Sequence, residues 1–253
     1  MCKVRPVQNN DRPMANGGFM KTMLVSLSLL LVSTIATADQ TQKYFEFGNP
    51  VVEEITSGPL TEIQTDFTST ACQATVAEAT LDPLNPIDRA HIYLDKVINL
   101  GKKLWSVVEL GRPVVNINVD SANALPQGVL CWNTLTGWRA PESKVYRVFY
   151  TNGFGSRVVD FSFRVIYTTG GTFNGQGQYI TNATVVPANL EVSWGYTFNA
   201  NTVVPSVFNS GTVERPVAGM QLNLNWSVDT VIKHSQQAET FYVGGDGSFK
   251  KLN

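Results

Sequence analysis

Three side chains, Asp88, His91 and Asp95, are spaced by three and four residues. On a helix this spacing places them along one face, and a carboxylate, an imidazole and a second carboxylate can bind a divalent metal. An exposed polar face that continues through Lys102 and Glu109 is the simpler interpretation, because no further His or Cys lies nearby in the sequence. The metal site is therefore only a hypothesis, and we predict no cofactor.

Two other pairs have the residue types that hydrolases use. His234 and Asp229 would serve nucleophilic catalysis together with a serine, but the chain has no Gly-x-Ser-x-Gly elbow. Asp160 and Glu191 lie on the polar faces of predicted strands and would suit a glycosidase. Outward carboxylates are common on sheets, so we assign no catalytic residue and favour a protein that is not an enzyme.

Trp138 and its neighbour Arg139 lie in a polar stretch without periodicity. An aromatic side chain in a loop can stack on a sugar ring or insert into a partner's pocket. Trp138 and Arg139 are therefore the predicted ligand-binding residues. The competing interpretation is a tryptophan that folds back over the core.

The glycine-rich stretch Gly170 to Gly177 resembles a phosphate-binding loop in composition only. Such a loop needs a helix N-terminus behind it, whereas this one lies between two predicted strands. It is predicted to be a hairpin tip.

The first 38 residues read as an export signal. Met20 and Lys21 precede the apolar run Met23 to Ile35, and Ala36 to Ala38 matches a small-residue cleavage site. The run is short for a membrane span. We expect cleavage near Ala38, an exported chain in the periplasm or outside the cell, and a start at Met1 that is either mis-assigned or extended.

The remaining residues 39–253 are long enough for one β-rich domain with a sizeable core. Segment 1–38 contains four basic residues and one acidic residue, so 15 of the 19 basic and 19 of the 20 acidic residues remain, a net charge of −4. A mildly acidic chain without basic clusters lacks the electrostatic pattern of a nucleic-acid-binding protein.

Cys72 and Cys131 are the two cysteines that remain after the leader is removed. In an exported chain we expect them to form a disulfide. Its loop of about 59 residues corresponds to roughly 4 kcal/mol in the chain-entropy model. A metal or reactive-thiol pair is the alternative, but the separation matches no short ligand spacing.

Residues 86–110 are predicted to form one long amphipathic helix. Apolar residues recur at steps of three and four, Asn85 and Pro86 suit its start, and Gly111 with Pro113 suits its end. We expect the helix to pack lengthwise across a sheet, after an irregular segment over residues 39–85.

Residues 114–251 are predicted to be strands and turns. Period-two alternation is clearest in Arg157 to Tyr167, Leu190 to Phe198 and Met220 to Val231. In the second of these, Trp194 and Tyr196 are assigned to the apolar face. Seven or more such strands favour an antiparallel β-sandwich, with a closed barrel as the alternative.

Three classes of function fit these features. An exported binding module of the cell envelope or exterior is favoured, with a glycan, a lipid or another envelope protein as partner. An outer-membrane or pore-forming β protein is the alternative. A carboxylate-based hydrolase is the least favoured.

Overall fold

The computed structural model describes residues 37–55, 84–95, 104–107, 121–129 and 131–252. Two compact units, Met1–Gln42 and Lys43–Asn253, divide the chain. In the first, residues 37–42 are helical, and Thr41 Oγ1 donates to the Thr37 carbonyl over 2.9 Å. No helix among the described residues is long and apolar enough to cross a membrane. Most of the predicted leader lies outside the described part of the chain.

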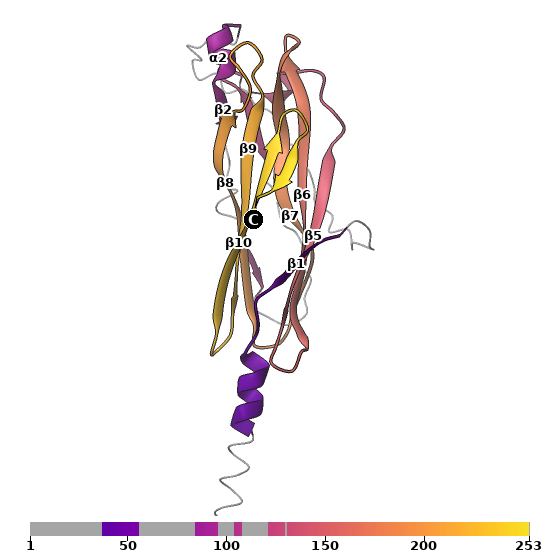
Figure 1. The fold of residues 1–253 in the computed structure, drawn as a ribbon, viewed down its shortest axis with the longest axis vertical. Helices are drawn as coiled ribbons and strands as arrows, with labels where there is room; N and C mark the ends of the chain where they lie inside the picture. Colours follow the sequence, from indigo (N-terminus) through magenta and orange to yellow (C-terminus); the bar gives the residue numbers. More distant parts are fainter. Residues whose placement is uncertain (1–36, 56–83, 96–103, 108–120, 130, 253) are drawn as a thin grey trace, which may run out of the picture. The chain divides into compact units, whose positions relative to one another are not determined.

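The second unit consists mainly of strands (Figure 1). They are β1 (Val51–Ile55), β2 (Ile92–Asp95), β3 (Leu104–Val107), β4 (Ala122–Pro126), β5 (Glu142–Thr151), β6 (Arg157–Phe173), β7 (Gln176–Val192), β8 (Thr197–Asn209), β9 (Ala218–Asp229), β10 (His234–Gly244) and β11 (Phe249–Lys251). The second unit also contains a short helix, α2 (Pro86–Ala90), and a 3₁₀ turn, η1 (Trp132–Thr134). Its first residues, 43–45, are helical as well.

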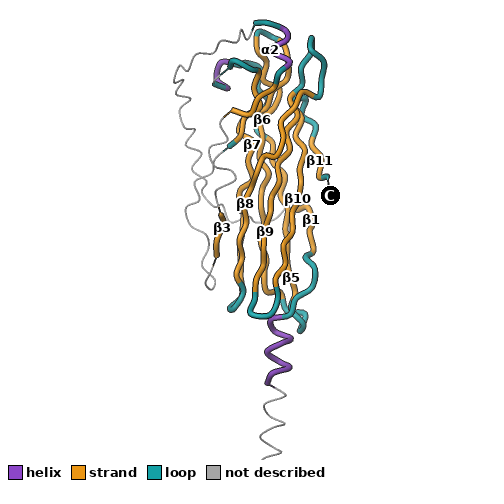
Figure 2. The backbone as a smooth tube through the Cα atoms, turned by 90° about the vertical axis from the view of Figure 1, so that its left-hand side faces the viewer, coloured by secondary structure: helices purple, strands orange, loops and turns teal. Residues whose placement is uncertain are grey.

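These strands form two antiparallel sheets and no closed barrel, so the predicted sandwich is confirmed. The six-stranded sheet has the order β1-β5-β6-β7-β4-β2, and the five-stranded sheet has the order β11-β10-β9-β8-β3. Figure 2 shows the long strands β8, β9 and β10 side by side. Both sheets are built around hairpin-connected meanders, which suits a chain with frequent turn signals.

Alternating side chains from both sheets fill the core. Phe161 of β6 lies 4.6 Å from Phe198 and 5.4 Å from Trp226, measured between ring centroids, and both of these belong to the other sheet. The Trp226 indole donates to the Tyr150 hydroxyl across the sheets over 2.9 Å. The period-two pattern thus turns the apolar residues of each strand toward the core between the sheets. The strands β6 and β7 are also largely buried on their other face.

The tight turn between β6 and β7 confirms the predicted hairpin tip. β6 ends at Phe173 and β7 begins at Gln176, so Asn174 and Gly175 form a two-residue connection. Both have positive φ, 50° and 73°, as a type I′ turn requires. The tip is shorter than the predicted stretch Gly170 to Gly177, because β6 continues through Gly170 and Gly171 to Phe173.

The long helix predicted over 86–110 is wrong. Helix α2 ends at Ala90, and the same stretch contributes β2 at one edge of the six-stranded sheet and β3 at one edge of the five-stranded sheet. The apolar stripe was wide because these residues supply strands to two sheets. A run this apolar fits a strand or a helix, and pairing with β4 and β8 selects strands.

The predicted strand Leu190 to Phe198 is also wrong. The chain leaves the six-stranded sheet after Val192 and enters the other sheet at Thr197. Gly195 makes this turn with a φ of +77°. Trp194, assigned to an apolar face, therefore lies at the turn and is 62% exposed.

Two short segments near residue 125 also differ from the pattern of their sequence. The sequence of Ala122 to Gly128 predicts a loop, but Ala122–Pro126 is strand β4 between β7 and β2. The sequence of Val129 to Trp132 predicts a short strand, but the chain there leads into η1. Cys131 is buried. Its expected partner, Cys72, lies outside the described residues, so the disulfide stays a prediction. The apolar residues 114–119 predict a further strand, which also lies outside the described residues.

Candidate functional site

The proposed metal ligands do not share a helical face. α2 ends at Ala90, so His91 follows the helix and Asp95 ends strand β2. His91 Nδ1 lies 2.8 Å from the carbonyl oxygen of Ile87, four residues earlier in the chain. Among the described residues no group of three His, Cys, Asp or Glu side chains is arranged to hold a metal ion. The spacing argument for the metal hypothesis depended on the long helix and is lost with it.

Trp138 folds back onto the sandwich and stays partly buried. Its indole nitrogen donates to the Trp132 carbonyl over 3.3 Å, and its six-membered ring lies over Gly171, where a Cβ would be 2.3 Å away. Arg139 Nη1 donates to the Asp246 carbonyl over 2.6 Å. These contacts attach the loop to β6 and to the turn after β10. They agree with the second interpretation of Trp138, a tryptophan that folds back over the core.

His234 and Asp229 form a hydrogen bond where β9 leads into β10. The Ser227 hydroxyl donates to the other Asp229 oxygen over 3.2 Å. In a catalytic triad the serine bonds to the histidine, and the histidine alone bonds to the carboxylate. Here both donors go to Asp229, so the arrangement does not activate a serine.

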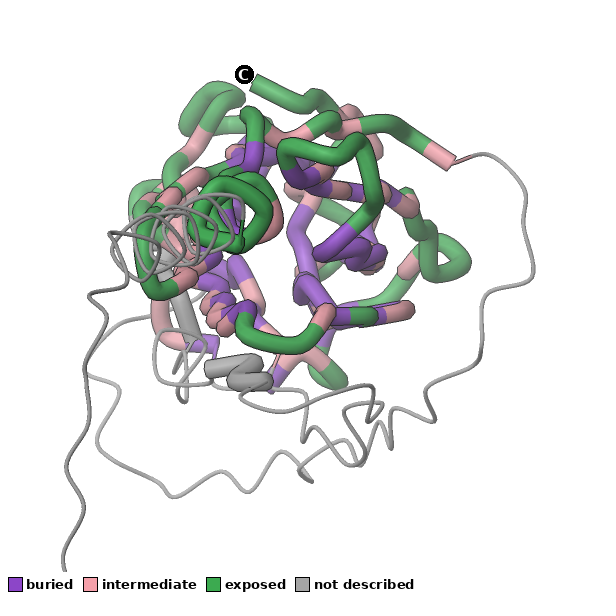
Figure 3. The backbone as a smooth tube through the Cα atoms, turned by 90° about the horizontal axis from the view of Figure 1, so that it is seen from below, coloured by how far each residue is buried: buried purple, intermediate pink, exposed green. Residues whose placement is uncertain are grey.

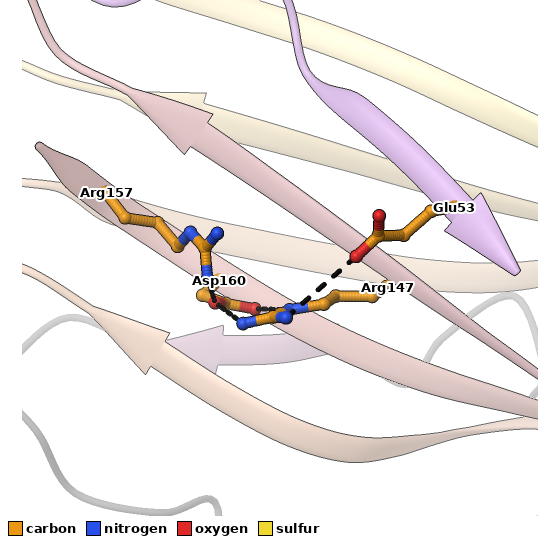
Figure 4. Close-up of polar contacts among 4 residues, drawn as sticks. All are labelled: Glu53, Arg147, Arg157 and Asp160. Carbon is orange, nitrogen blue, oxygen red and sulfur yellow. Dashed lines mark hydrogen bonds and ion pairs between the residues drawn. The ribbon is translucent and has the colours of Figure 1, made fainter. Parts of the chain in front are cut away.

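Asp160 and Glu191 are opposite each other on β6 and β7, but the carboxylate of Asp160 is occupied. Figure 4 shows its oxygens between two guanidinium groups. Arg147 donates from Nε over 2.9 Å and Arg157 from Nη1 over 3.1 Å. This hydrogen bonding raises the pKa of the Arg147 guanidinium. Both Asp160 oxygens accept these bonds, so none is available for proton transfer to a substrate.

This ion cluster is a structural feature of the outer face of the six-stranded sheet. The Asp160 side chain is 8% exposed, and Arg147 also lies 3.9 Å from Glu53 of β1. The Arg157 guanidinium stacks over the Phe149 ring at 4.4 Å. The Asp229–His234 pair belongs to the other sheet. The Asp160 cluster and this pair therefore do not form one site.

The outer face of the five-stranded sheet is a candidate site that the sequence interpretation missed. Inward residues of β9, such as Leu222 and Leu224, are buried, and the residues between them are partly exposed. We call the polar members of this outward set the amide face; it comprises Asn199, Asn201, Gln221, Asn223, Asn225, Ser227, Gln236 and Thr240. The outward residues Val203 and Ala238 lie among them.

The amide face is ordered in rows across three strands. Asn199, Ser227 and Gln236 form one row, and Asn201 and Asn225 are opposite each other in the next. On β8, β9 and β10 no residue in the four rows from Asn199 to Ser206 of β8 carries a charge. Lys250 of β11 lies opposite Tyr242 and extends the fourth row. Amide groups both donate and accept hydrogen bonds, so this flat surface suits a neutral ligand that does the same.

An exposed aromatic pair ends the amide face. Phe208, 41% exposed, stacks on Tyr242 with ring centroids 6.1 Å apart and an interplanar angle of 27°. Both rings lie over Gly219, where a Cβ would be 2.9 Å from the Phe208 ring and 3.1 Å from the Tyr242 ring. Glycine at this position allows the two rings to settle onto the strand.

Part of this site is readable from the sequence. Asn223, Asn225 and Ser227 alternate with apolar residues, which already indicates an uncharged polar face. The pairing of β9 with β8 and β10 is what places the other amides and Phe208 beside them. No protein-family model matches this chain, and comparisons with curated proteins and with solved structures also found no match.

Proposed function

We propose that the chain is an exported, non-enzymatic binding module that takes a neutral glycan on the amide face. The observation that supports it is the uncharged row pattern of Asn, Gln, Ser and Thr that ends at Phe208 and Tyr242. Sugar hydroxyls donate and accept, as amides do, and the apolar face of a sugar ring stacks on an aromatic ring.

The absence of charge in the four rows of β8, β9 and β10 favours a neutral ligand. A site for a phosphate or a carboxylate uses Arg, Lys or clustered backbone donors. The charged Asp229–His234 row and Lys250 lie at the margins of the face. A neutral chain several sugars long would lie along the strands, from the amide rows to the aromatic pair.

The export signal in residues 20–38 supports a ligand outside the cytoplasm. The ion pairing of Asp160 and the bonding pattern around Asp229 favour binding over hydrolysis. These features keep the carboxylate hydrolase as the less favoured class.

Affinity electrophoresis tests the proposal. The protein is run through gels that contain xylan, mannan, laminarin or hydroxyethyl cellulose, with polygalacturonate as an anionic comparison. We expect one neutral polysaccharide to retard the protein and Phe208→Ser to weaken that binding about tenfold, since stacking and buried apolar area are lost.

Phe154→Ser is the matched control, because Phe154 is also an exposed phenylalanine but lies in the turn between β5 and β6. It should leave glycan binding unchanged. Equal migration in all neutral gels, or equal loss in both variants, would contradict the proposal.

A further inference from the structure

Three turns of the sandwich meet at the segment 43–47. The Gly153 amide donates to the Lys43 carbonyl over 2.9 Å, and the Tyr44 hydroxyl donates to the Trp194 carbonyl over 3.0 Å. Thr230 Oγ1 donates to the Phe45 carbonyl over 3.1 Å. We call this the loop end; it comprises segment 43–47 and the turns 152–156, 193–196 and 230–233.

The tips of these turns carry large apolar side chains that face solvent. Phe154 is 53% exposed, Trp194 62%, Val231 78% and Ile232 54%. They are four of the ten large apolar residues exposed in the described part of the chain. Figure 3 views the molecule from this end and shows the exposed turns around a buried interior. Turn tips are usually polar, so this set requires an explanation.

The turns are well fixed, so the apolar tips are held in place. Asn152 Oδ1 accepts from the amides of Phe154 and Ser156, each over 3.0 Å. The Trp194 ring lies 6.1 Å from the Phe45 ring. Thr230 Oγ1 accepts from the Lys233 amide over 3.0 Å. Each tip therefore projects its side chain from a hydrogen-bonded turn.

The sequence before the sandwich indicates which surface the protein reaches. The apolar run Met23 to Ile35 matches an export signal. A run of this kind enters the membrane during export, whether it is removed or retained. A chain that carries it is therefore brought to a lipid bilayer.

We propose that the loop end rests on a lipid bilayer and inserts Phe154, Trp194, Val231 and Ile232 at the level of the head groups. Four separate projections from three turns suit a soft, deformable surface, whereas a protein partner that binds a single peptide or side chain needs a groove. Tryptophan and phenylalanine are favoured at this depth, since the interface accommodates an apolar ring with a polar edge. The inference does not depend on the glycan proposal.

Vesicle flotation of the chain from Asp39 tests this. That chain retains the compact unit Lys43–Asn253 and lacks the apolar run, which would itself bind lipid. The vesicles contain phosphatidylcholine, or phosphatidylethanolamine with phosphatidylglycerol. We expect the protein to float with at least one type, and Val231→Ser with Ile232→Ser to lower the partition coefficient about tenfold. Trp194→Ser should act in the same direction.

Phe208→Ser is the control, since it removes an exposed aromatic ring from the amide face and should leave flotation unchanged. A wild-type chain that stays at the bottom of the gradient with both lipid types would overturn the proposal. So would loop-end variants that float like wild type. If sedimentation velocity shows a dimer that these variants dissociate, the loop end binds a second copy and the lipid proposal is wrong. Because Phe208→Ser and the loop-end variants act on different assays, the two proposals fail independently.

Discussion

The two sheets share one core but have outer faces of different chemistry. On the six-stranded sheet, two guanidinium groups donate hydrogen bonds to Asp160, so these charges are paired within the molecule. On the five-stranded sheet, the amide face presents uncharged donors and acceptors that are partly exposed. A face that satisfies its own charges contributes to stability. A face of half-exposed amides beside an aromatic pair is suited to binding something else.

Alkaline unfolding should affect both faces together and is the largest expected effect. Burial raises the pKa of Tyr146, Tyr167, Tyr179 and Tyr196 to about 12. In the unfolded chain they ionise near pH 10. Between these values the unfolded state loses protons that the folded state keeps, so the free energy of unfolding falls as pH rises.

Each unit of pKa difference corresponds to about 1.4 kcal/mol for each tyrosine. Urea unfolding at about pH 8 and about pH 11 should therefore show a loss of several kcal/mol. Equal stability at the two values would mean that these hydroxyls are accessible to water in the folded state.

Asp160→Ala should break the six-stranded face alone. It removes the shared acceptor of Arg147 and Arg157 and leaves two guanidinium groups close together. Because both arginines are partly exposed, we expect a loss of about 2 kcal/mol, below the range for a fully buried pair. Asn201→Ala on the amide face should change stability by less than about 0.5 kcal/mol. Similar losses in both variants would remove the distinction between the faces.

Trp138→Ala tests whether Trp138, which the sequence predicts to bind the ligand, contributes to stability or to affinity. The indole packs on Gly171 and on Trp132, so its removal should cost about 2 kcal/mol in urea unfolding. Affinity for the retarding polysaccharide should stay unchanged. A selective loss of affinity with full stability would restore Trp138 as the ligand-binding residue.

Gly219→Ala should have the smallest effect and sharpens the description of the aromatic pair. The added methyl group would displace Phe208 and Tyr242, and we expect about a threefold loss of glycan affinity with little change in stability, since threefold is well below the tenfold step of about 1.4 kcal/mol. Gly48→Ala is the control, because a Cβ there meets nothing within 4 Å. Unchanged affinity in Gly219→Ala would show that the rings do not touch the ligand.

The sequence was sufficient to predict strands where apolar and polar residues alternate along the chain. The alternation in β6 and β9 identified the inward residues Phe161 and Trp226, which meet across the sheets. The dipeptide Asn174-Gly175 likewise identified its own turn, because its positive φ values are a local property.

Alternation failed where the chain changes sheets. Val192, Trp194 and Tyr196 continue the apolar alternation of β7 without a break, but Gly195 turns the chain between them. The helix prediction for residues 86–110 failed for a related reason. The period of the apolar residues and the capping residues cannot distinguish a helix with a wide apolar face from two short edge strands. The amide face was missed since cross-strand register, which no single strand encodes, brings its members together.

Segment 43–47 also determines when the fold can be completed. Its Phe45 and Phe47 are buried at the loop end, yet Tyr44, Phe45 and Phe47 bond to partners 150, 185 and 186 residues later in the chain. During synthesis these residues emerge well before their partners. Contacts so distant in sequence form slowly. The sandwich is therefore closed by a segment that precedes all of its described strands, and only after β9 and the turn that follows it have been made.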